Sequence, residues 1–112
     1  MKYELTSNTK TIFGKTLYQI RALKDFDSVR AGDLGGWIEG ERNLSQDGYA
    51  WVEGDARVSG NALISGNARV SDNAAVGNNA RVFGNARVFG DATVYGAVST
   101  TFGLSESFNK EH

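Results

Sequence analysis

The chain has 112 residues and a formal net charge of −1, with 12 lysines and arginines against 13 aspartates and glutamates. This length predicts a single domain, and the balanced charge argues against general binding to long nucleic acids or to membranes. No cysteine is present, which excludes disulfides and thiolate chemistry, and no apolar run resembles a signal region or a membrane span, so we expect a soluble, cytoplasmic protein.

Residues 1–32 are predicted to form an N-terminal β-hairpin. Residues 3–26 contain two strand patterns joined near Phe13-Gly14-Lys15. The second strand, Thr16 to Lys24, places one set of side chains on a single face, because strand side chains alternate; these are Tyr18, Ile20 and Ala22. The hairpin either caps the coils that follow or takes part in recognition, and the sequence leaves both open.

Residues 33–50 are predicted to form an irregular first coil of the repeat that follows. Ile38, Leu44 and Ala50 lie six residues apart, in phase with the alanines of the later units. Gly35-Gly36 predicts a tight chain entry, because glycine allows close backbone approach, and the phosphate-binding spacing G-x-x-x-x-G-K is missing. Trp37 is expected in the core or in a cap.

Residues 51–96 repeat every six residues in the register V-x-G-N-A-R. A branched aliphatic residue heads each unit, and an alanine follows four positions later. The aliphatic series is Val52, Val58, Ile64, Val70, Val76, Val82, Val88 and Val94, and the alanine series is Ala50, Ala56, Ala62, Ala68, Ala74, Ala80, Ala86 and Ala92. Similarity at a fixed short period is typical of a solenoid.

Each hexad is consistent with one short strand followed by a corner. In Arg57-Val58-Ser59 the two outer side chains point away and Val58 points inward. Gly60-Asn61 then turns the chain, because Gly and Asn tolerate the backbone angles of a corner. Ala62 faces inward at that corner, where only a small side chain fits.

The repeat resembles the hexapeptide repeat of left-handed parallel β-helices. The resemblance implies an all-β fold with a left-handed parallel β-helix over residues 33–96, in which three hexads form one triangular coil and the chain makes about three to four short coils. It also implies a homotrimer with parallel axes, which suits the thin core of so short a prism. The face with Ala75 and Gly77 in its middle is smooth enough for close packing between subunits.

A more particular resemblance rests on Leu17 to Phe26, on A-G-D-L-G-G-W at 31–37 and on the G-N-A-R-V repeats. Together these segments look like the YdcK-like hexapeptide-repeat proteins of enterobacteria, which also exist as short versions in phages and prophages. The resemblance covers most of residues 1–96. It implies a short member of phage type, located in the host cytoplasm if phage-encoded.

Residues 97–112 are predicted to form a C-terminal cap or tail. An open coil end exposes unpaired backbone groups and needs cover, and Phe102, Leu104 and Phe108 supply apolar side chains for it. Whether this segment covers its own coil or reaches a neighbouring subunit is left open.

The sequence contains few candidate catalytic residues. Acyltransferases with this type of repeat typically use a histidine base, and related zinc enzymes use three histidine ligands, whereas His112 is the one histidine here and stands at the last position. The carboxylates form no evident acid–base pair; they are Glu53, Asp55, Asp72 and Asp91. We therefore expect no catalytic residue, no metal and no cofactor.

The outward side chains predict three columns if each coil takes eighteen residues. The first face carries Trp51, Glu53, Arg69, Ser71, Arg87 and Phe89; the second carries Arg57, Ser59, Ala75, Gly77, Thr93 and Tyr95; the third carries Leu63, Ser65, Arg81 and Phe83, then Ser99 and Thr101 if the same register continues. Stacked arginines repel mildly unless an anion lies between them. Arginine forks beside aromatic rings suit a phosphate attached to a base.

The candidate ligand-binding residues are therefore Arg57, Arg69, Arg81, Arg87, Trp51, Phe83, Phe89 and Tyr95. Two simpler interpretations stay open. The arginines cover strand edges with their stems while their heads remain in water, and the aromatic residues contact neighbouring subunits.

Three functions are compatible with this sequence. The first is a non-catalytic binding protein of phage origin, which sequesters a small anionic nucleotide, such as a cyclic nucleotide messenger of host immunity, in clefts between the subunits of a homotrimer. The second is a structural or protein-interaction module that docks a partner protein. The third is an acyltransferase, which the histidine argument disfavours.

Overall fold

A computed structural model of the chain describes residues 1–95, 97–99 and 103–104. Two long strands, β1 (Tyr3–Ile12) and β2 (Lys15–Ala22), are followed by β3 (Leu34–Ile38) and one turn of 3₁₀-helix, Glu41–Asn43. The repeat strands are β4 (Trp51–Val52), β5 (Arg57–Val58), β6 (Leu63–Ile64), β7 (Arg69–Val70), β8 (Ala75–Val76), β9 (Arg81–Phe83), β10 (Arg87–Val88), β11 (Thr93–Val94), β12 (Ala97–Ser99) and β13 (Gly103–Leu104). The predicted all-β class is confirmed.

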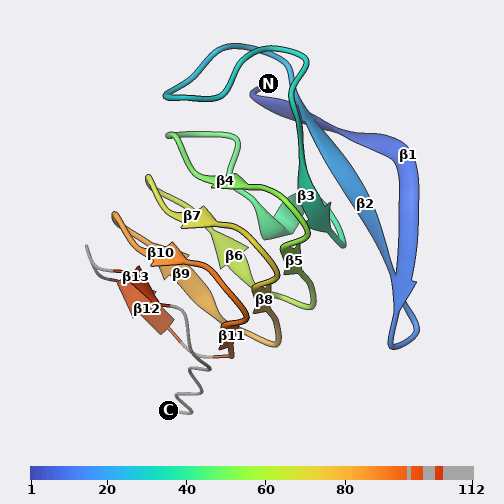
Figure 1. Cartoon of the computed structure of the whole chain (residues 1–112), viewed down its shortest axis with the longest axis vertical. Coiled ribbons are helices and arrows are strands. Elements are labelled where there is room, and N and C mark those ends of the chain that lie inside the picture. Colours follow the sequence, from blue (N-terminus) through green and yellow to red (C-terminus); the bar gives the residue numbers. More distant parts are fainter. Residues whose placement is uncertain (96, 100–102, 105–112) are drawn as a thin grey trace.

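The repeat winds into a parallel β-helix with three faces (Figure 1). The first face is formed by β4, β7, β10 and β13, the second by β3, β5, β8 and β11, and the third by β6, β9 and β12. Strands eighteen residues apart lie in register, as in the pairs Arg57 with Ala75 and Ala75 with Thr93. Backbone hydrogen bonds join each coil to the next, for example from Ser59 N to Val76 O at 2.9 Å. The predicted parallel β-helix is confirmed.

The core is the column of aliphatic and alanine side chains that the repeat predicts. All members of both series between Ala50 and Val94 are at most 2% exposed. Branched side chains fill the middle of each face, and alanines fit the corners, where two faces meet. The corners use glycine with positive φ, such as Gly60 at +65°; in the two hexads that lack it, Asp72 and Asn78 adopt the left-handed conformation at 59° and 57°. Asp and Asn accept this conformation better than other non-glycine residues.

The phase predicted for the first coil is wrong. Ile38 pairs with Val58, and Leu44 bridges to Ile64, so both side chains continue the aliphatic series and not the alanine series. The chain from Leu44 to Val52 therefore contains two residues more than a regular hexad. This longer loop carries Gln46, whose Oε1 accepts a hydrogen bond from Lys2 N at 2.8 Å.

The register predicted for the third face after Phe83 is also wrong. Ala97 pairs with Arg81 and Ser99 pairs with Phe83, because the step between Val94 and Val98 is two residues shorter than a hexad. The parallel pairing then continues to β13, where Leu104 pairs with Val88. The β-helix thus extends past residue 96, and the predicted positions of Thr101, Phe102 and Phe108 lie outside the described residues.

The N-terminal hairpin lengthens the sheet of the second face. β1 and β2 pair antiparallel, β2 pairs antiparallel with β3, and β3 pairs parallel with β5, which gives the strand order β1-β2-β3-β5-β8-β11. In Figure 1 the hairpin stands to the right of the stacked coils and curves alongside them. The long strands bring the hairpin turn close to a corner of the second face.

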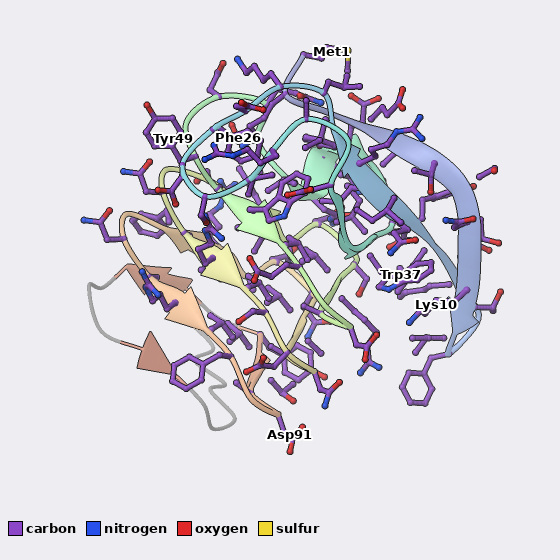
Figure 2. The ribbon with its side chains drawn as sticks, turned by 45° about the horizontal axis from the view of Figure 1, so that its top comes forward. Met1, Lys10, Phe26, Trp37, Tyr49 and Asp91 are labelled. Carbon is purple, nitrogen blue, oxygen red and sulfur yellow. The ribbon has the colours of Figure 1, made fainter. Side chains whose placement is uncertain are left out.

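Lys2 and Tyr3, at the beginning of the chain, cover the end of the first coil. Lys2 Nζ donates to Ala50 O at 2.7 Å, and the Tyr3 hydroxyl donates to Leu44 O at 2.6 Å. Both side chains are buried, at 1% and 0% exposure. Figure 2 shows how the N-terminal segment and the loop that contains Phe26 gather above the coils. Carbonyl groups that would otherwise face no partner are thereby hydrogen-bonded.

Candidate functional site

The first face aligns Trp51, Arg69 and Arg87 on successive coils, as predicted. Trp51, however, is only 2% exposed. Its ring packs edge-on against Phe26, with ring centroids 5.3 Å apart, and against Tyr3 at 6.5 Å. The expectation that Trp51 is open to ligands or subunits is wrong, because the segment between β2 and β3 covers it.

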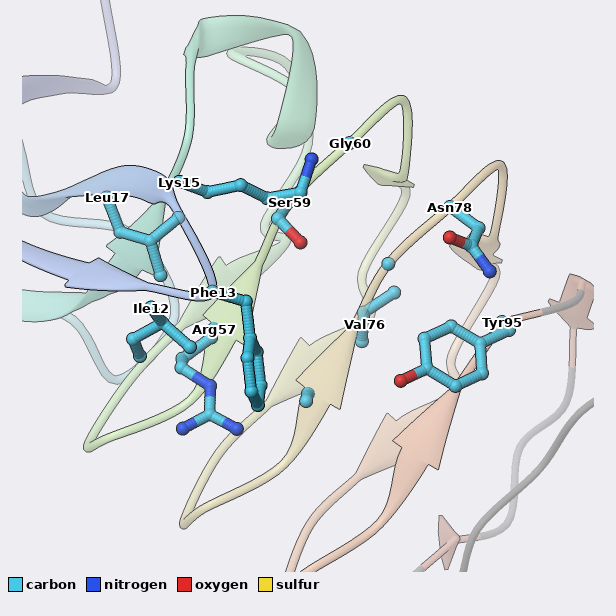
Figure 3. A pocket seen from close by; sticks show the side chains of 12 residues that line it. Ile12, Phe13, Lys15, Leu17, Arg57, Ser59, Gly60, Val76, Asn78 and Tyr95 are labelled. Atoms are coloured by element: carbon cyan, nitrogen blue, oxygen red, sulfur yellow. The ribbon is translucent and has the colours of Figure 1, made fainter.

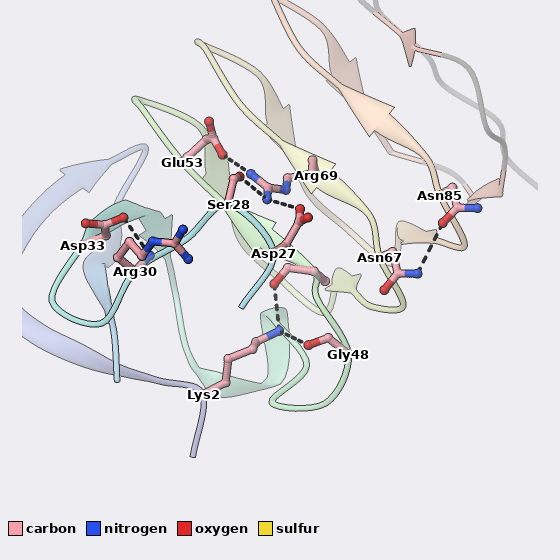
Figure 4. A network of polar contacts seen from close by, with 11 residues as sticks. Lys2, Asp27, Ser28, Arg30, Asp33, Gly48, Glu53, Asn67, Arg69 and Asn85 are labelled. Atoms are coloured by element: carbon pink, nitrogen blue, oxygen red, sulfur yellow. Dashed lines mark hydrogen bonds and ion pairs between the residues drawn. The ribbon is translucent and has the colours of Figure 1, made fainter. Parts of the chain in front are cut away.

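Arg69 lies at the centre of a polar network with Asp27, Ser28 and Glu53 (Figure 4). Its guanidinium donates to Glu53 Oε1 at 2.8 Å, to Asp27 Oδ2 at 2.5 Å and to Ser28 Oγ at 2.9 Å. Charge-assisted contacts of this kind compensate the cation. The anions beside the Arg69–Arg87 stack are therefore carboxylates of the chain itself, and Arg69 is largely occupied.

Arg87 remains free of ion pairs within the described part of the chain. It borders an open depression of about 580 Å³, which also contains the side chains of the Arg69 network and Phe89. Phe89 is 36% exposed. Because strand residues two apart point to the same side, Arg87 and Phe89 present a cation and a ring together. The carboxylates of Asp27, Glu53 and Asp72 make the rest of this depression acidic.

The third face also carries an arginine beside a phenylalanine, on the preceding strand β9. Arg81 and Phe83 are both exposed on β9, and Val82 between them is buried. The sequence motif Arg-Val-Phe therefore occurs in two consecutive hexads, at 81–83 and 87–89. Each motif places an arginine and a phenylalanine on the outer surface of the β-helix.

The second face carries a groove, which we call the hairpin groove, between the hairpin turn and the coils. Its functional side chains are Phe13 and Lys15 from the hairpin and Arg57, Ser59, Asn78 and Tyr95 from the coils. Its volume is about 210 Å³. Figure 3 shows Phe13 and Tyr95 on opposite sides of the groove, with Val76 between them. The prediction of a smooth second face is wrong, because Tyr95 and the hairpin turn occupy it.

Gly77 explains how the Tyr95 ring lies in this groove. A Cβ at Gly77 would lie 3.3 Å from Tyr95 Cε1 and 3.5 Å from Ser59 Oγ. The glycine therefore leaves the space that the ring fills on the neighbouring coil, an arrangement in which an aromatic residue covers a cross-strand glycine.

The turn that holds Phe13 is strained. Phe13 has φ of 52° and Gly14 has φ of 79°, and the pair of positive values between paired Ile12 and Lys15 is that of a type I′ hairpin turn. Asn-Gly is preferred there, and a bulky residue in the left-handed region costs about 1 kcal/mol or more. Phe13 is nevertheless 96% exposed, so its ring gains no packing within the chain that would offset this cost.

Of the predicted site residues, Arg57 and Tyr95 line the hairpin groove, whereas the hairpin residues Phe13 and Lys15 were not predicted. Phe13 and Lys15 lie far in sequence from Arg57 and Tyr95, and no periodicity connects them. The one available signal was a Phe-Gly pair at a two-residue hairpin turn, where Asn-Gly is usual. Two of the Arg69 partners, Asp27 and Ser28, were missed for the same reason, since they precede Arg69 by 42 and 41 residues.

The described residues offer little for acid–base or metal chemistry. None of residues 1–95, 97–99 and 103–104 is a histidine, and they hold no group of His, Cys, Asp or Glu side chains that could bind a metal ion. His112 lies outside this range. No helix in the described segments is long and apolar enough to cross a membrane.

Two comparisons with known proteins concern the repeat. A family model described as YdcK beta solenoid repeat matches residues 64–78, 80–96 and 86–99. A curated protein of Escherichia coli (strain K12), the uncharacterized acetyltransferase YdcK, is 50% identical to this chain over 36 residues. That match spans 32% of this chain and only 11% of the relative. Over residues 64–99 the repeat is thus similar to the YdcK beta solenoid repeat, which confirms the predicted resemblance for this part of the chain.

Proposed function

We propose that this chain, built on a YdcK-type β-solenoid repeat, is a non-catalytic binding protein that captures a small anionic ligand of nucleotide type. In this proposal the protein is a homotrimer of phage origin. It acts in the host cytoplasm, and it sequesters a nucleotide second messenger of host immunity in clefts between subunits. Capture without turnover requires only rigid donors and rings, which a β-helix holds in place before binding.

The observation that carries this proposal is the repeated Arg-Val-Phe motif on β9 and β10. Arg81 and Arg87 have no ion-pair partner within the described residues. Phe83 lies on β9 with Arg81, Phe89 directly follows β10, and both rings are exposed. A guanidinium can bind a phosphate through two hydrogen bonds, and an exposed ring can stack on a base. The two parts of a nucleotide are matched by the two side chains of each motif.

The trimer in this proposal completes a site that one chain leaves open. The depression beside Arg87 and Phe89 is open, and two of its carboxylates, Asp27 and Glu53, are bound to Arg69. A second subunit that covers this face would exclude water and add its own arginine or phenylalanine. A short solenoid with a thin core also gains stability from association.

Isothermal titration calorimetry of the intact chain against cyclic dinucleotides, larger cyclic oligonucleotides and cyclic ADP-ribose isomers tests the proposal. We expect saturable binding of at least one of these compounds, a loss of about ten-fold or more in Arg87→Met, and a trimer in sedimentation. The control is Arg30→Met, which removes an exposed arginine from the segment between β2 and β3. Absence of binding to every compound, or a monomer at micromolar concentration, contradicts the proposal.

Two alternatives are separated by other measurements. The name of the curated relative raises acetyl transfer, and an acetyl-CoA hydrolysis or transfer assay tests it; we expect no release of CoA. A protein-interaction module is favoured by one feature, the 96% exposed ring of Phe13 at the hairpin turn. Capture of one protein from host lysate by the wild type, lost in Phe13→Asn, would support that alternative.

A further inference from the structure

We propose that the hairpin groove binds a small planar ring carrying one carboxylate or phosphate group, with one such site in each chain. This inference goes beyond the function proposed above, because no second subunit contributes to the groove. All of its functional side chains come from the hairpin turn and from the second face of the same chain.

The charge of the groove favours an anion. Lys15 and Arg57 both line it, and no carboxylate is among its lining residues. Lys15 Nζ is 3.9 Å from Glu39 Oε1, but that oxygen also accepts a hydrogen bond from Gly60 N at 2.7 Å and approaches Arg42 at 3.4 Å. Arg57 has no ion-pair partner in the described part of the chain, so its planar fork is available for two parallel hydrogen bonds to a carboxylate or phosphate.

The walls of the groove favour a flat ring. Phe13 and Tyr95 stand on opposite sides, and apolar side chains that include Val76 form the floor between them (Figure 3). Aromatic side chains bind planar groups by stacking and edge contacts. Because Gly77 has no side chain, the Tyr95 ring can occupy the space beside it. The Tyr95 ring therefore has its position before a ligand binds.

The size of the groove limits the ligand. Its volume is about 210 Å³, and a cavity of about 150 Å³ is enough for benzene. The space above that of a bare ring corresponds to one small anionic group. A larger molecule would fit only if the rest of it projects from the open side.

The conformation of the turn provides an independent reason. Phe13 holds a positive φ that a phenylalanine rarely adopts, and its ring is almost fully exposed. An outlier that gains nothing within the chain points to a role for the side chain outside it. A ligand between Phe13 and Tyr95 supplies the missing contact.

The test is an NMR titration of the ¹⁵N-labelled full-length chain with benzoate and with phenyl phosphate. Benzamide and inorganic phosphate are the controls for charge and ring. We expect saturable shifts at the amides of Gly14, Lys15, Ser59 and Gly77, with an affinity for one of the two probes about ten-fold or more above that for either control. The better of the two probes identifies the anion as a carboxylate or a phosphate.

Two variants and one control separate this site from a structural effect. Phe13→Asn suits the turn and is expected to keep the fold while weakening the affinity for the probe about five-fold or more. Arg57→Met is expected to weaken it about ten-fold, and Arg30→Met is expected to change nothing. Equal binding of benzamide or of inorganic phosphate, unchanged affinity in folded Phe13→Asn, or no shifts at millimolar probe would overturn the inference. Arg87 lies outside the groove, so Arg87→Met should leave probe binding unchanged. The nucleotide proposal and the groove proposal can therefore fail independently of each other.

Discussion

The side-chain amide of Asn43 donates a hydrogen bond of 2.8 Å to the carbonyl oxygen of Ala62, next to the point where Leu44 of the first coil bridges to Ile64. Inside the stack the equivalent carbonyl of Ala80 accepts from the backbone of Leu63 at 3.0 Å. Asn43 also accepts, through Oδ1, from the backbone N–H groups of Glu39 at 3.0 Å and Gly40 at 2.9 Å. The buried amide of Asn43 thus takes the place of the one backbone N–H that a regular coil supplies to this carbonyl group.

This relationship predicts that Asn43→Ala lowers the free energy of unfolding by about 2 to 4 kcal/mol, because buried donors and acceptors lose their partners at about 1 to 3 kcal/mol each. Urea unfolding followed by circular dichroism measures the change. Asn61→Ala, at an exposed corner, is the matched control and should cost less than about 0.5 kcal/mol. Equal losses in the two variants would show that Asn43 does not close the coil.

Neighbouring alanines on the second face test the alternation of inward and outward side chains. Ala74 is fully buried at a corner, whereas Ala75 begins β8 and points outward. Ala74→Leu should destabilise the chain by about 1 to 3 kcal/mol or more through overpacking, and Ala75→Leu should change stability by less than about 0.5 kcal/mol. Thermal and urea unfolding of both variants give the comparison. A larger loss of stability in Ala75→Leu would mean that Ala75, and not Ala74, points into the core, which would contradict the assigned register.

Lys2 predicts an unusual pH dependence of stability. Burial lowers the pKa of Lys2 from 10.5 to about 8, with Asp47 opposing the shift and Lys24 adding to it. Between pH 8 and about 10 the unfolded chain binds more protons than the folded chain, so the free energy of unfolding rises with pH, by at most about 1.4 kcal/mol per unit. Above that range burial of Tyr3, which raises the pKa of its hydroxyl, acts in the opposite direction because the folded chain retains that proton.

The measurement is urea unfolding at several pH values between 7 and 10 for the wild type and for Lys2→Met. The rise of the free energy of unfolding with pH should disappear in Lys2→Met, because this variant lacks the titrating amine. A slope of the same size in both proteins would assign it to another group.

The two stacked arginines of the first face are expected to have different roles. Arg69→Met should lower stability by about 1 kcal/mol, a modest value because Asp27 and Glu53 are partly exposed, at 57% and 43% of their side chains. Arg87→Met should leave stability within about 0.5 kcal/mol and reduce nucleotide binding. Unfolding and calorimetry on both variants decide this, and a reversed pattern would mean that Arg69 is the ligand contact.

Phe13→Asn should stabilise the chain by about 1 kcal/mol, because the left-handed conformation at this turn suits asparagine and strains phenylalanine. The midpoint of urea unfolding reports the change. A lower midpoint would mean that the Phe13 ring contributes to folding and would remove the reason for assigning it an external role.

The repeat alone predicted much of this fold. Val58, Val76 and their equivalents face the core because a six-residue period specifies the same inward position in every coil. The insertion after Leu44 and the shortening after Val94 could not be predicted, since each changes the length of one corner loop without altering the apolar residues on either side of it.

The candidate surface was predictable only where it follows the period. Arg81, Phe83, Arg87 and Phe89 are exposed as expected. Three features depend on where a non-repeating segment folds back: the burial of Trp51 by Phe26, the pairing of Arg69 with Asp27, and the position of Phe13 in the groove that Tyr95 also lines. Such long-range contacts leave no periodic trace in the sequence.

The capture of a small nucleotide without turnover is tested most directly by incubating the purified chain with a mixture of cyclic nucleotides, removing unbound compounds, denaturing the protein and identifying the released molecules by mass spectrometry. We expect one nucleotide to be recovered chemically unchanged from the wild type and to be depleted in Arg87→Met. Recovery of a converted product, or of no nucleotide at all, would contradict the account.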